Sequence, residues 1–263
     1  MERIRATFER LRRQRRKALI PFIMGGDPNL STTKSLLLAL QDAGADLIEV
    51  GIPFSDPLAD GPVIQAASAR ALRNGATPMT VLQTITKVRP RLHVPIVALT
   101  YWNPIAQWGM TAFAHAAQAS GLSGVIVPDL PVEESGPFRQ IATRAQVAAI
   151  LLAAPTSPAA RLRMIARASQ GFIYYVSVTG TTGARASLPP TVTHGVRQLK
   201  LLTTKPICVG FGISTPAQAS MIARVADGVI VGSALIRTMA EAKTRSSMVK
   251  RAAAFVARLR KAV

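Results

Sequence analysis

The stretch Leu47-Ile-Glu-Val-Gly-Ile-Pro-Phe-Ser-Asp-Pro-Leu-Ala-Asp-Gly-Pro62 begins as a short apolar strand and continues as a loop rich in proline, glycine and acidic residues. Glu49 interrupts the apolar run, although helices normally cover both faces of a parallel sheet and keep its strands apolar. Burying a carboxylate costs several kcal/mol unless the group is paired or protonated. The pattern allows two interpretations. Either Glu49 accepts hydrogen bonds from the next loop, or burial raises its pKa and the protein uses this property for its function. We favour the second interpretation.

A second carboxylate, Asp60, lies in the loop after this strand, directly before Gly61-Pro62. It could be a simple N-cap for a helix that starts near Val63. Two carboxyl groups at one end of one strand are instead suited to proton transfer at two points of a small molecule. We therefore predict Glu49 and Asp60 as catalytic residues.

Apolar strands and amphipathic helices alternate on both sides of this stretch. Strands are predicted at residues 18–24, 46–50, 95–100, 124–127, 147–152, 172–176, 207–209 and 228–231, with helices between them and at residues 2–16. Such alternation with short connections indicates a parallel sheet with right-handed crossovers, and eight units close into a barrel. A doubly wound open sheet would need a Gly-rich fingerprint after its first strand, and Met24-Gly-Gly-Asp-Pro28 is not one. We predict an α/β fold, a single (β/α)8 TIM-barrel domain over residues 1–263 with an extra N-terminal helix.

Composition supports a globular chain of 263 residues that are 49% hydrophobic. No apolar run is long enough to span a bilayer, and the N-terminus lacks the apolar segment of a secretory signal. The single cysteine, Cys208, lies in an apolar strand and is expected to be a small buried hydrophobic residue. These features predict a cytoplasmic location and no membrane partner.

The formal net charge of +19 is unusual and concentrates at the two ends of the chain. Residues 1–17 carry eight Lys or Arg against two acids, and residues 243–263 carry seven against none. A basic surface can bind nucleic acid or an acidic partner. Solvated helix faces explain the pattern more simply, because no aromatic residues alternate with the basic ones as in a stacking surface. Nucleic acid is therefore not the expected partner.

Three late loops contain small residues with free backbone amides, namely Gly180-Thr-Thr-Gly183, Gly210-Phe-Gly212 and Gly232-Ser233. Backbone N–H groups and a helix N-terminus attract anions, and phosphate sites recur in the last loops of barrels. Each glycine pair alone could be only a tight turn. Together the three loops predict a phosphate site, and the absence of a Walker lysine argues against a nucleoside triphosphate.

Apolar and aromatic residues near the strand ends are candidates for binding the rest of the ligand. They are Phe22, Ile64, Leu99, Tyr101, Val127, Tyr174 and Phe211. The three histidines are scattered without the spacing of metal ligands, so no metal is predicted. A nucleophile elbow and a strand-end lysine are also missing. The site is expected to work by acid/base catalysis and positioning alone.

Five segments resemble the tryptophan synthase alpha chain family in order along the chain. They are Ile20-Pro-Phe-Ile-Met-Gly-Gly-Asp-Pro28, Ile48-Glu-Val-Gly-Ile-Pro-Phe-Ser-Asp-Pro-Leu-Ala-Asp-Gly-Pro-Val-Ile-Gln65, Pro128-Asp-Leu-Pro131, Tyr174-Tyr-Val-Ser-Val-Thr-Gly180 and Gly210-Phe-Gly-Ile-Ser214. The resemblance implies a TIM barrel that cleaves indole-3-glycerol phosphate to indole and glyceraldehyde 3-phosphate without a cofactor. It also implies an αββα heterotetramer with a PLP-dependent beta chain, to which indole passes through a tunnel.

The resemblance also implies roles for individual residues. Glu49 matches the general acid/base at the indole ring carbon and the side-chain hydroxyl, and Asp60 matches the acceptor of the indole N–H. Tyr174 matches a site-lining tyrosine. The phosphate-binding positions correspond to Gly183, Gly212, Gly232 and Ser233, and subunit communication to Asp56, Asp129 and Thr182.

The charge departs from the family, whose members are commonly near neutral or acidic. The beta-chain contact is compatible with it if the basic residues lie at the bottom of the barrel, where both terminal helices are expected. Two other classes stay open at this point. One is a phosphate-binding barrel of another activity, such as a sugar-phosphate isomerase or epimerase, and the other is a basic binding protein that has lost catalysis.

Overall fold

The structure, a computed structural model, describes residues 1–176, 190–210 and 212–263. Its strands are β1 Ala18–Met24, β2 Ile48–Gly51, β3 Ile96–Leu99, β4 Gly124–Ile126, β5 Ala148–Ala153, β6 Ile173–Val176, β7 Ile207–Gly210 and β8 Gly228–Val231. Its helices are α1 Glu2–Arg13, α2 Leu30–Asp42, α3 Pro62–Arg73, α4 Pro78–Val88, α5 Trp102–Trp108, α6 Met110–Ala119, α7 Gly136–Arg144, α8 Ala159–Ala168, α9 Pro190–Leu202, α10 Pro216–Ala223, α11 Ser233–Ala240 and α12 Arg245–Arg260, with a 3-10 turn at Arg89–Arg91.

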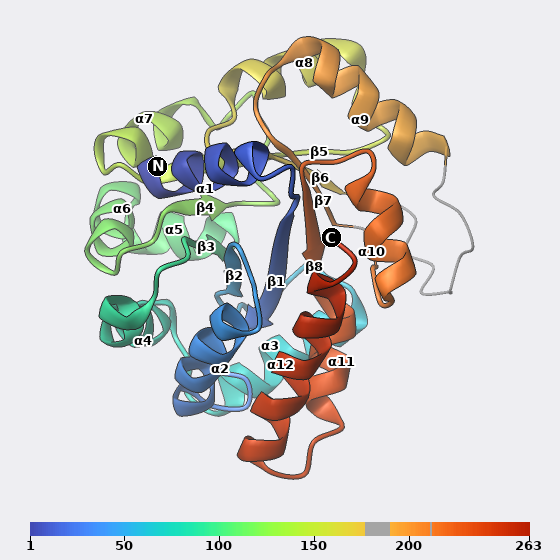
Figure 1. Cartoon of the computed structure of the whole chain (residues 1–263). Coiled ribbons are helices and arrows are strands. Elements are labelled where there is room, and N and C mark those ends of the chain that lie inside the picture. The colour runs from blue at the N-terminus through green and yellow to red at the C-terminus, as the bar shows by residue number, and fades with distance from the viewer. Residues whose placement is uncertain (177–189, 211) are drawn as a thin grey trace.

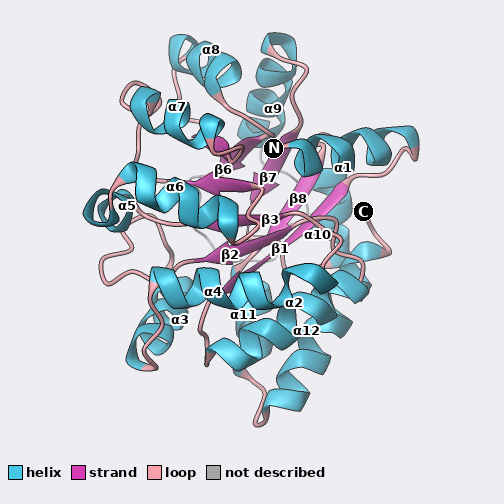
Figure 2. Cartoon of the chain, turned by 90° about the vertical axis from the view of Figure 1, so that its left-hand side faces the viewer, coloured by secondary structure: helices cyan, strands magenta, loops and turns pink. Residues whose placement is uncertain are grey.

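The eight strands form a closed parallel barrel surrounded by helices (Figures 1 and 2). Each strand pairs with the next, and β1 also pairs with β8, where Ala18 aligns with Gly228. This closure confirms the predicted (β/α)8 barrel and excludes the open doubly wound sheet. All strand C-terminal ends therefore meet at one rim, where barrel active sites are built.

The predicted strands agree with the structure within two residues at each end, and β2 shows the largest difference. Strand β2 starts at Ile48 and not at Asp46, whose side chain turns away to accept the N–H of Leu19. Helix α5 was not predicted, because Tyr101-Trp-Asn-Pro104 has the composition of a turn. Pro104 is tolerated there since it lies in the first helical turn, where backbone N–H groups have no intrahelical partner.

Helix α1 closes the N-terminal end of the barrel. Ile4, Phe8 and Leu11 are buried and pack against inward-facing residues of several strands, and the rings of Phe8 and Phe172 lie 6.0 Å apart. Cys208 is fully buried in the same interior cluster, as its apolar context predicts. The end of the barrel opposite the rim is thus filled by apolar side chains.

Helix α12 is placed differently from the prediction that both terminal helices lie at the bottom of the barrel. It runs along the outer wall beside α2 and α11 (Figure 1). The reason is its apolar stripe, because Ala252, Phe255, Val256 and Leu259 are all buried against this wall. Only its last turn reaches the N-terminal end.

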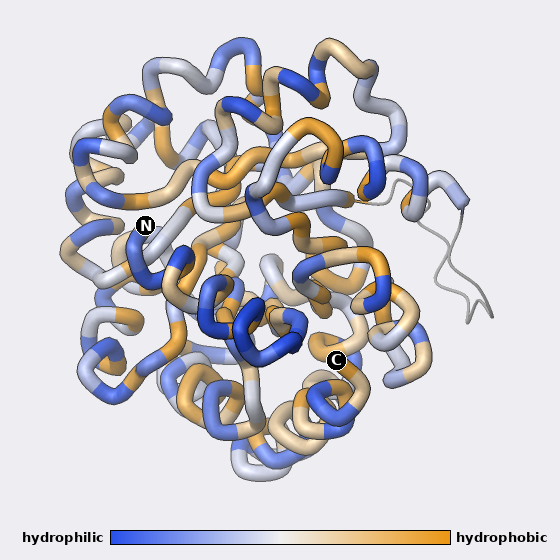
Figure 3. Tube along the Cα trace, turned by 45° about the horizontal axis from the view of Figure 1, so that its top comes forward, coloured by the Kyte–Doolittle hydropathy of each residue, from blue (hydrophilic) through white to orange (hydrophobic). Residues whose placement is uncertain are grey.

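Hydrophobic residues concentrate on the strands and the inner sides of the helices, whereas α1, which starts at the N label of Figure 3, is mostly hydrophilic along its exposed side. A second apolar layer lies between the strands and the surrounding helices. Within the three described ranges, no helix has the combination of length and apolarity that crossing a membrane requires.

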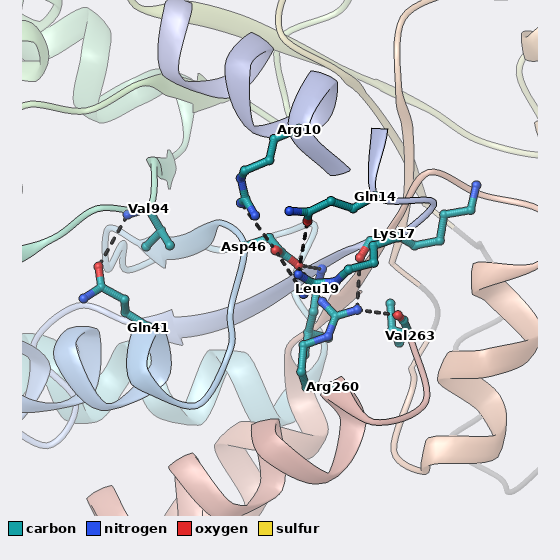
Figure 4. A network of polar contacts seen from close by, with 10 residues as sticks. Arg10, Gln14, Lys17, Leu19, Gln41, Asp46, Val94, Arg260 and Val263 are labelled. Carbon is teal, nitrogen blue, oxygen red and sulfur yellow. Dashed lines mark hydrogen bonds and ion pairs between the residues drawn. The ribbon is translucent and has the colours of Figure 1, made fainter. Parts of the chain in front are cut away.

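The last turn of α12 is held by Asp46, which is 4% exposed (Figure 4). One carboxylate oxygen accepts the Leu19 N–H at 3.0 Å and lies 2.5 Å from an Arg260 guanidinium nitrogen. The other oxygen lies 3.7 Å from Arg10 and from Arg16. Asp46 therefore joins β1, α1 and α12 at one point.

We expect Asp46→Ala to lower the free energy of unfolding by about 2–4 kcal/mol, because it leaves the Leu19 N–H and the partly buried Arg260 without their acceptor. Urea unfolding measures this loss. Asp42→Ala is the matched control, since Asp42 is exposed and its removal should change stability by less than about 0.5 kcal/mol. Equal losses in the two variants would contradict the role assigned to Asp46.

Candidate active site

A cavity of about 620 Å³ opens at the C-terminal rim of the barrel. Glu49 and Asp60 both line it, so the structure brings together the two carboxyl groups that the sequence selects. The other lining residues are Phe22, Ala59, Gly61, Ile64, Leu99, Pro128, Leu152, Tyr174, Val176, Gly210, Gly212, Ile230, Gly232 and Ser233. The cavity is mostly apolar, with the polar groups restricted to a few positions.

Glu49 points into the barrel from β2, in register with Phe22 on β1 and Val97 on β3. It is 1% exposed, and neither carboxylate oxygen has a hydrogen-bond partner among the described residues. The alternative in which backbone amides of the next loop satisfy this carboxylate is therefore not observed there. Burial, with a smaller contribution from the nearby Asp60, raises the pKa of Glu49 to about 8. Glu49 can thus hold a proton at neutral pH and release it to a ligand.

Asp60 faces the same cavity from the loop that follows β2. It is not the N-cap of α3, because that position is taken by Gly61. Burial raises the pKa of Asp60 to about 6, and a hydrogen bond from the Tyr101 hydroxyl opposes this rise. Asp60 is consequently ionised at neutral pH and can accept a hydrogen bond while Glu49 stays protonated. Two carboxyl groups with separated pKa values are the arrangement that divides acid and acceptor roles.

Tyr101 fixes the loop that carries Asp60. Its hydroxyl accepts the N–H of Ala59 at 3.1 Å, and its ring lies 5.4 Å from that of Phe54. Ser68 holds Phe54 from the other side, because its hydroxyl accepts the Phe54 N–H at 3.0 Å and donates to the Phe54 carbonyl at 2.9 Å. The loop that carries Asp60 is therefore held by contacts from α3 and from the residue before α5.

The predicted substrate-binding residues divide into two groups. Phe22, Ile64, Leu99 and Tyr174 line the cavity. Tyr101 does not line it and acts on the Asp60 loop, as described above. Val127 also lies outside the cavity. It comes two residues after Val125 of β4, so both side chains face the helices and lie in the apolar layer between strands and helices. Phe211 lies outside the described residues.

Several lining residues were missed by the sequence interpretation, among them Leu152 and Ile230. Alternate residues of a strand point to the same face, so the period of two within residues 148–153 and 228–231 carries this signal. Leu152 aligns with Tyr174 across β5 and β6, which places both at the same level of the barrel. Val176 carries the same signal, because it lies two residues after Tyr174 on β6, whereas Pro128 lies in the loop after β4 and has none.

The small residues of the last two loops meet at one side of the cavity. Gly212, Gly232 and Ser233 line it, and Ser233 is the first residue of α11, so the free N–H groups of that helix face the cavity. Gly212 has a φ of +52° and no heavy atom within 4 Å of the position of a Cβ, which leaves room for close approach to its backbone. Gly183 lies outside the described residues.

The three residues proposed for subunit communication lie at different places. Asp56 is exposed in the loop after β2. Asp129 accepts the N–H of Trp102, the first residue of α5, at 2.9 Å and 3.1 Å. This contact ties the loop after β4 to the loop after β3, directly beside Tyr101. Thr182 lies outside the described residues.

In the part of the chain that the structure describes, no group of three or more His, Cys, Asp or Glu residues could hold a metal ion. A closed barrel whose rim cavity holds two carboxyl groups of different pKa defines a TIM-barrel enzyme of the acid/base kind.

The sequence pattern of the tryptophan synthase alpha chain family matches residues 8–263. The chain is 52% identical over 237 residues to the tryptophan synthase alpha chain of Geotalea daltonii, covering 90% of each chain. It is 46% identical to that of Geobacter sulfurreducens over 100% of this chain and 99% of the relative. The solved alpha subunit of Legionella pneumophila str. Paris superposes with a TM-score of 0.91 at 38% identity, covering 99% of this chain and 97% of that one. The chain belongs to the tryptophan synthase alpha chain family.

The raised pKa of the buried Glu49 predicts how the stability of the protein changes with pH. Its pKa is about 8 in the folded chain against 4.5 in the unfolded one, so its stabilising effect is complete below about pH 4.5 and is lost as the pH rises to about 8. We expect Glu49→Gln to remove this loss and to make the protein more stable than wild type by about 5 kcal/mol at pH 9. Urea unfolding at pH 5, 7 and 9 measures the difference.

Glu134→Gln is the control for this series, because it makes the same chemical change at an exposed carboxylate. Its stability should follow wild type at all three pH values. A Glu49→Gln curve that also runs parallel to wild type would show that the folded pKa of Glu49 is not raised.

Proposed function

We infer that this chain is the alpha subunit of tryptophan synthase, a carbon–carbon lyase that cleaves indole-3-glycerol phosphate to indole and glyceraldehyde 3-phosphate in tryptophan biosynthesis. Family membership supports this function over the full length of the chain. The observation that carries the chemistry is Glu49, a buried carboxyl group without a described partner beside an ionised Asp60 in an apolar cavity. Other phosphate-binding barrels and a non-catalytic binding protein do not account for that pair.

In this proposal Glu49 performs the proton transfers of a retro-aldol cleavage. As the protonated acid it donates to the indole ring carbon that bears the glycerol phosphate chain. As the resulting carboxylate it takes the proton of the side-chain hydroxyl, and the carbon–carbon bond breaks as that oxygen becomes a carbonyl. A pKa of about 8 suits both steps, because the group is neither a strong acid nor a strong base at neutral pH.

Asp60 is proposed to accept the hydrogen bond of the indole N–H. Positive charge develops at the ring nitrogen when the ring carbon is protonated, and a carboxylate beside it lowers the energy of that state. The pKa of about 6 keeps Asp60 ionised for this role at neutral pH. The apolar wall that includes Phe22, Leu99 and Tyr174 would contact the indole ring.

The phosphate group is proposed to bind at the N-terminus of α11, on Gly212, Gly232 and Ser233. These residues line the cavity, and the positive end of the helix dipole favours an anion there. Gly183 belongs to the same proposal. The reaction needs only proton transfer and charge stabilisation from this chain, so no cofactor is assigned to it, and PLP is assigned to the beta chain.

The beta chain is proposed to dock beside the loop after β2 and to form an αββα heterotetramer. A second, largely apolar cavity of about 530 Å³ lies there and includes Phe54, Leu72, Met79 and Trp108. Leu72 is 36% and Met79 is 52% exposed, and Leu58 in the adjoining loop is 90% exposed. Apolar surface of this kind is typical of a site covered by a partner. Because Phe54 contacts Tyr101, this surface connects to the loop of Asp60.

We further propose that residues 1–263 form one domain and that the protein acts in the cytoplasm, where amino-acid biosynthesis takes place. The single cysteine is consistent with a reducing compartment.

The activity is tested by measuring indole release from indole-3-glycerol phosphate, with and without a tryptophan synthase beta chain. We expect slow turnover by the purified chain that rises with the partner. Glu49→Gln should lower kcat by about 10²- to 10⁴-fold, the range typical of a lost general acid/base, whereas Glu134→Gln should not change it. Absence of indole in both conditions would refute the function, and an active Glu49→Gln variant would refute the assigned role.

The role of the loop after β2 in communication is tested with Asp56→Ala. Asp56 is exposed and lies between Phe54 and the exposed Leu58, so its removal should leave the basal indole release within about two-fold of wild type. The acceleration by the beta chain should fall by about ten-fold. Titration of the variant with beta chain separates weaker association from lost activation. Unchanged activation would remove Asp56 from the proposal, and the same test applies to Asp129→Asn and Thr182→Ala.

A further inference from the structure

The basic residues at the end of α1 gather on the face of the barrel opposite the active site. The last turn of α1, the helix that closes the N-terminal end, carries Arg12 and Arg13, and Arg15, Arg16 and Lys17 follow it. These five residues are here called the α1 basic face. All thirteen acidic residues of the chain lie within the described ranges, so every acidic residue that could pair with this face has a known position.

Two acidic residues near this face are already engaged in internal contacts. Asp46 accepts the Leu19 N–H and pairs with Arg260, with Arg16 at 3.7 Å. Asp227 accepts the Ile207 N–H at 3.1 Å and lies 3.5 Å from both Lys17 and Lys200. Each carboxylate is therefore shared among several cations and leaves most of the positive charge uncompensated.

Arg12, Arg13 and Arg15 are exposed and form no ion pair with any acidic residue of the chain. Arg12 and Arg15, together with Arg16 and Lys17, line a surface cavity of about 250 Å³ between the end of α1 and Pro206. Four cations thus converge on one hollow with Asp227 as its single acidic residue. Such an arrangement attracts a polyanion.

Arg15 occupies a position that does not favour its side chain. Its φ is +54°, in the left-handed region that glycine and asparagine adopt more easily at a helix end. Folding alone would favour glycine there. The turn would therefore accept glycine at this position.

The surroundings of the face indicate which polyanion fits. The apolar side of α1, with Ile4, Phe8 and Leu11, is buried in the barrel and is not free to enter a lipid layer. Over the described ranges, the large hydrophobic side chains that are exposed are all Leu or Met, so this face offers no aromatic platform for unpaired bases. Cations without stacking groups suit contacts to phosphate alone, which are independent of sequence.

The lack of aromatic residues among the basic ones argues only against a surface that stacks unpaired bases, and a duplex, whose bases are already stacked, needs no such surface. From these contacts we propose that the α1 basic face binds the phosphate backbone of duplex nucleic acid. Because the face lies at the barrel end opposite the rim cavity, a bound duplex leaves the active site open. Binding and catalysis are therefore separable, and this proposal does not depend on the proposed function.

The test is fluorescence anisotropy of a labelled 24-base-pair DNA duplex of arbitrary sequence with the full-length protein, repeated over a range of NaCl concentrations. Wild type should bind with an affinity that falls linearly with salt on logarithmic axes. The triple variant Arg12→Gln/Arg13→Gln/Arg15→Gln should reduce that slope by about three and the affinity at low salt by at least about ten-fold.

The matched control is Lys34→Gln/Arg73→Gln/Lys243→Gln, which also removes three exposed cations that form no ion pair, but from α2, α3 and the loop before α12. It should bind within about two-fold of wild type. Arg15→Gly is the second variant, because the left-handed position should accept glycine without loss of stability while the salt slope falls by about one. Thermal unfolding and indole release verify that all variants are folded.

Several outcomes would overturn the proposal. These are no binding by wild type at 50 mM NaCl, equal losses in the triple variant and its control, or tighter binding of single-stranded than of duplex DNA. Tighter binding to vesicles of anionic phospholipid than to the duplex would assign the face to a membrane surface instead.

Discussion

The pairing of β1 with β8 is the interaction on which the rest of this structure depends. It turns a row of eight strands into a closed barrel without edges, with Ala18 opposite Gly228 and Pro21 opposite Val231. Closure buries the inward side chains on all sides, and α1 seals the lower end with Ile4, Phe8 and Leu11. Without the pairing of β1 with β8, Glu49 would lie on an open sheet in contact with water and would have an ordinary pKa.

Burial has opposite consequences for two carboxylates of the β2 segment, Asp46 and Glu49. Asp46, below the strand, is surrounded by donors and joins three elements through the Leu19 N–H and Arg260. Glu49, within the strand, has no described donor, and its pKa rises to about 8. The same type of group is therefore structural where it is satisfied and chemically active where it is not, because an unpaired buried charge is expensive and a retained proton removes that cost.

The barrel also places two sets of charged residues at opposite ends. At the rim, Glu49 and Asp60 are sheltered from solvent, and their roles depend on low polarity and on precise support from Tyr101, Phe54 and Ser68. At the opposite end, Arg12, Arg13 and Arg15 are exposed, and their effect depends on uncompensated charge. The apolar interior of the barrel lies between the two sets.

The sequence by itself determined the eight-unit alternation, the two carboxyl groups and the glycine-rich late loops, because each is a local pattern of residue types along the chain. It did not determine α5, since Pro104 is compatible with both a turn and a first helical turn, nor the course of α12, which depends on which wall its apolar stripe meets. Tertiary structure alone decided that Tyr101 supports the Asp60 loop, that Val127 faces the helices and that Leu152 and Ile230 line the cavity. These outcomes require the barrel to be closed, because the distance between residues on different strands is fixed by register and curvature, which no single segment encodes.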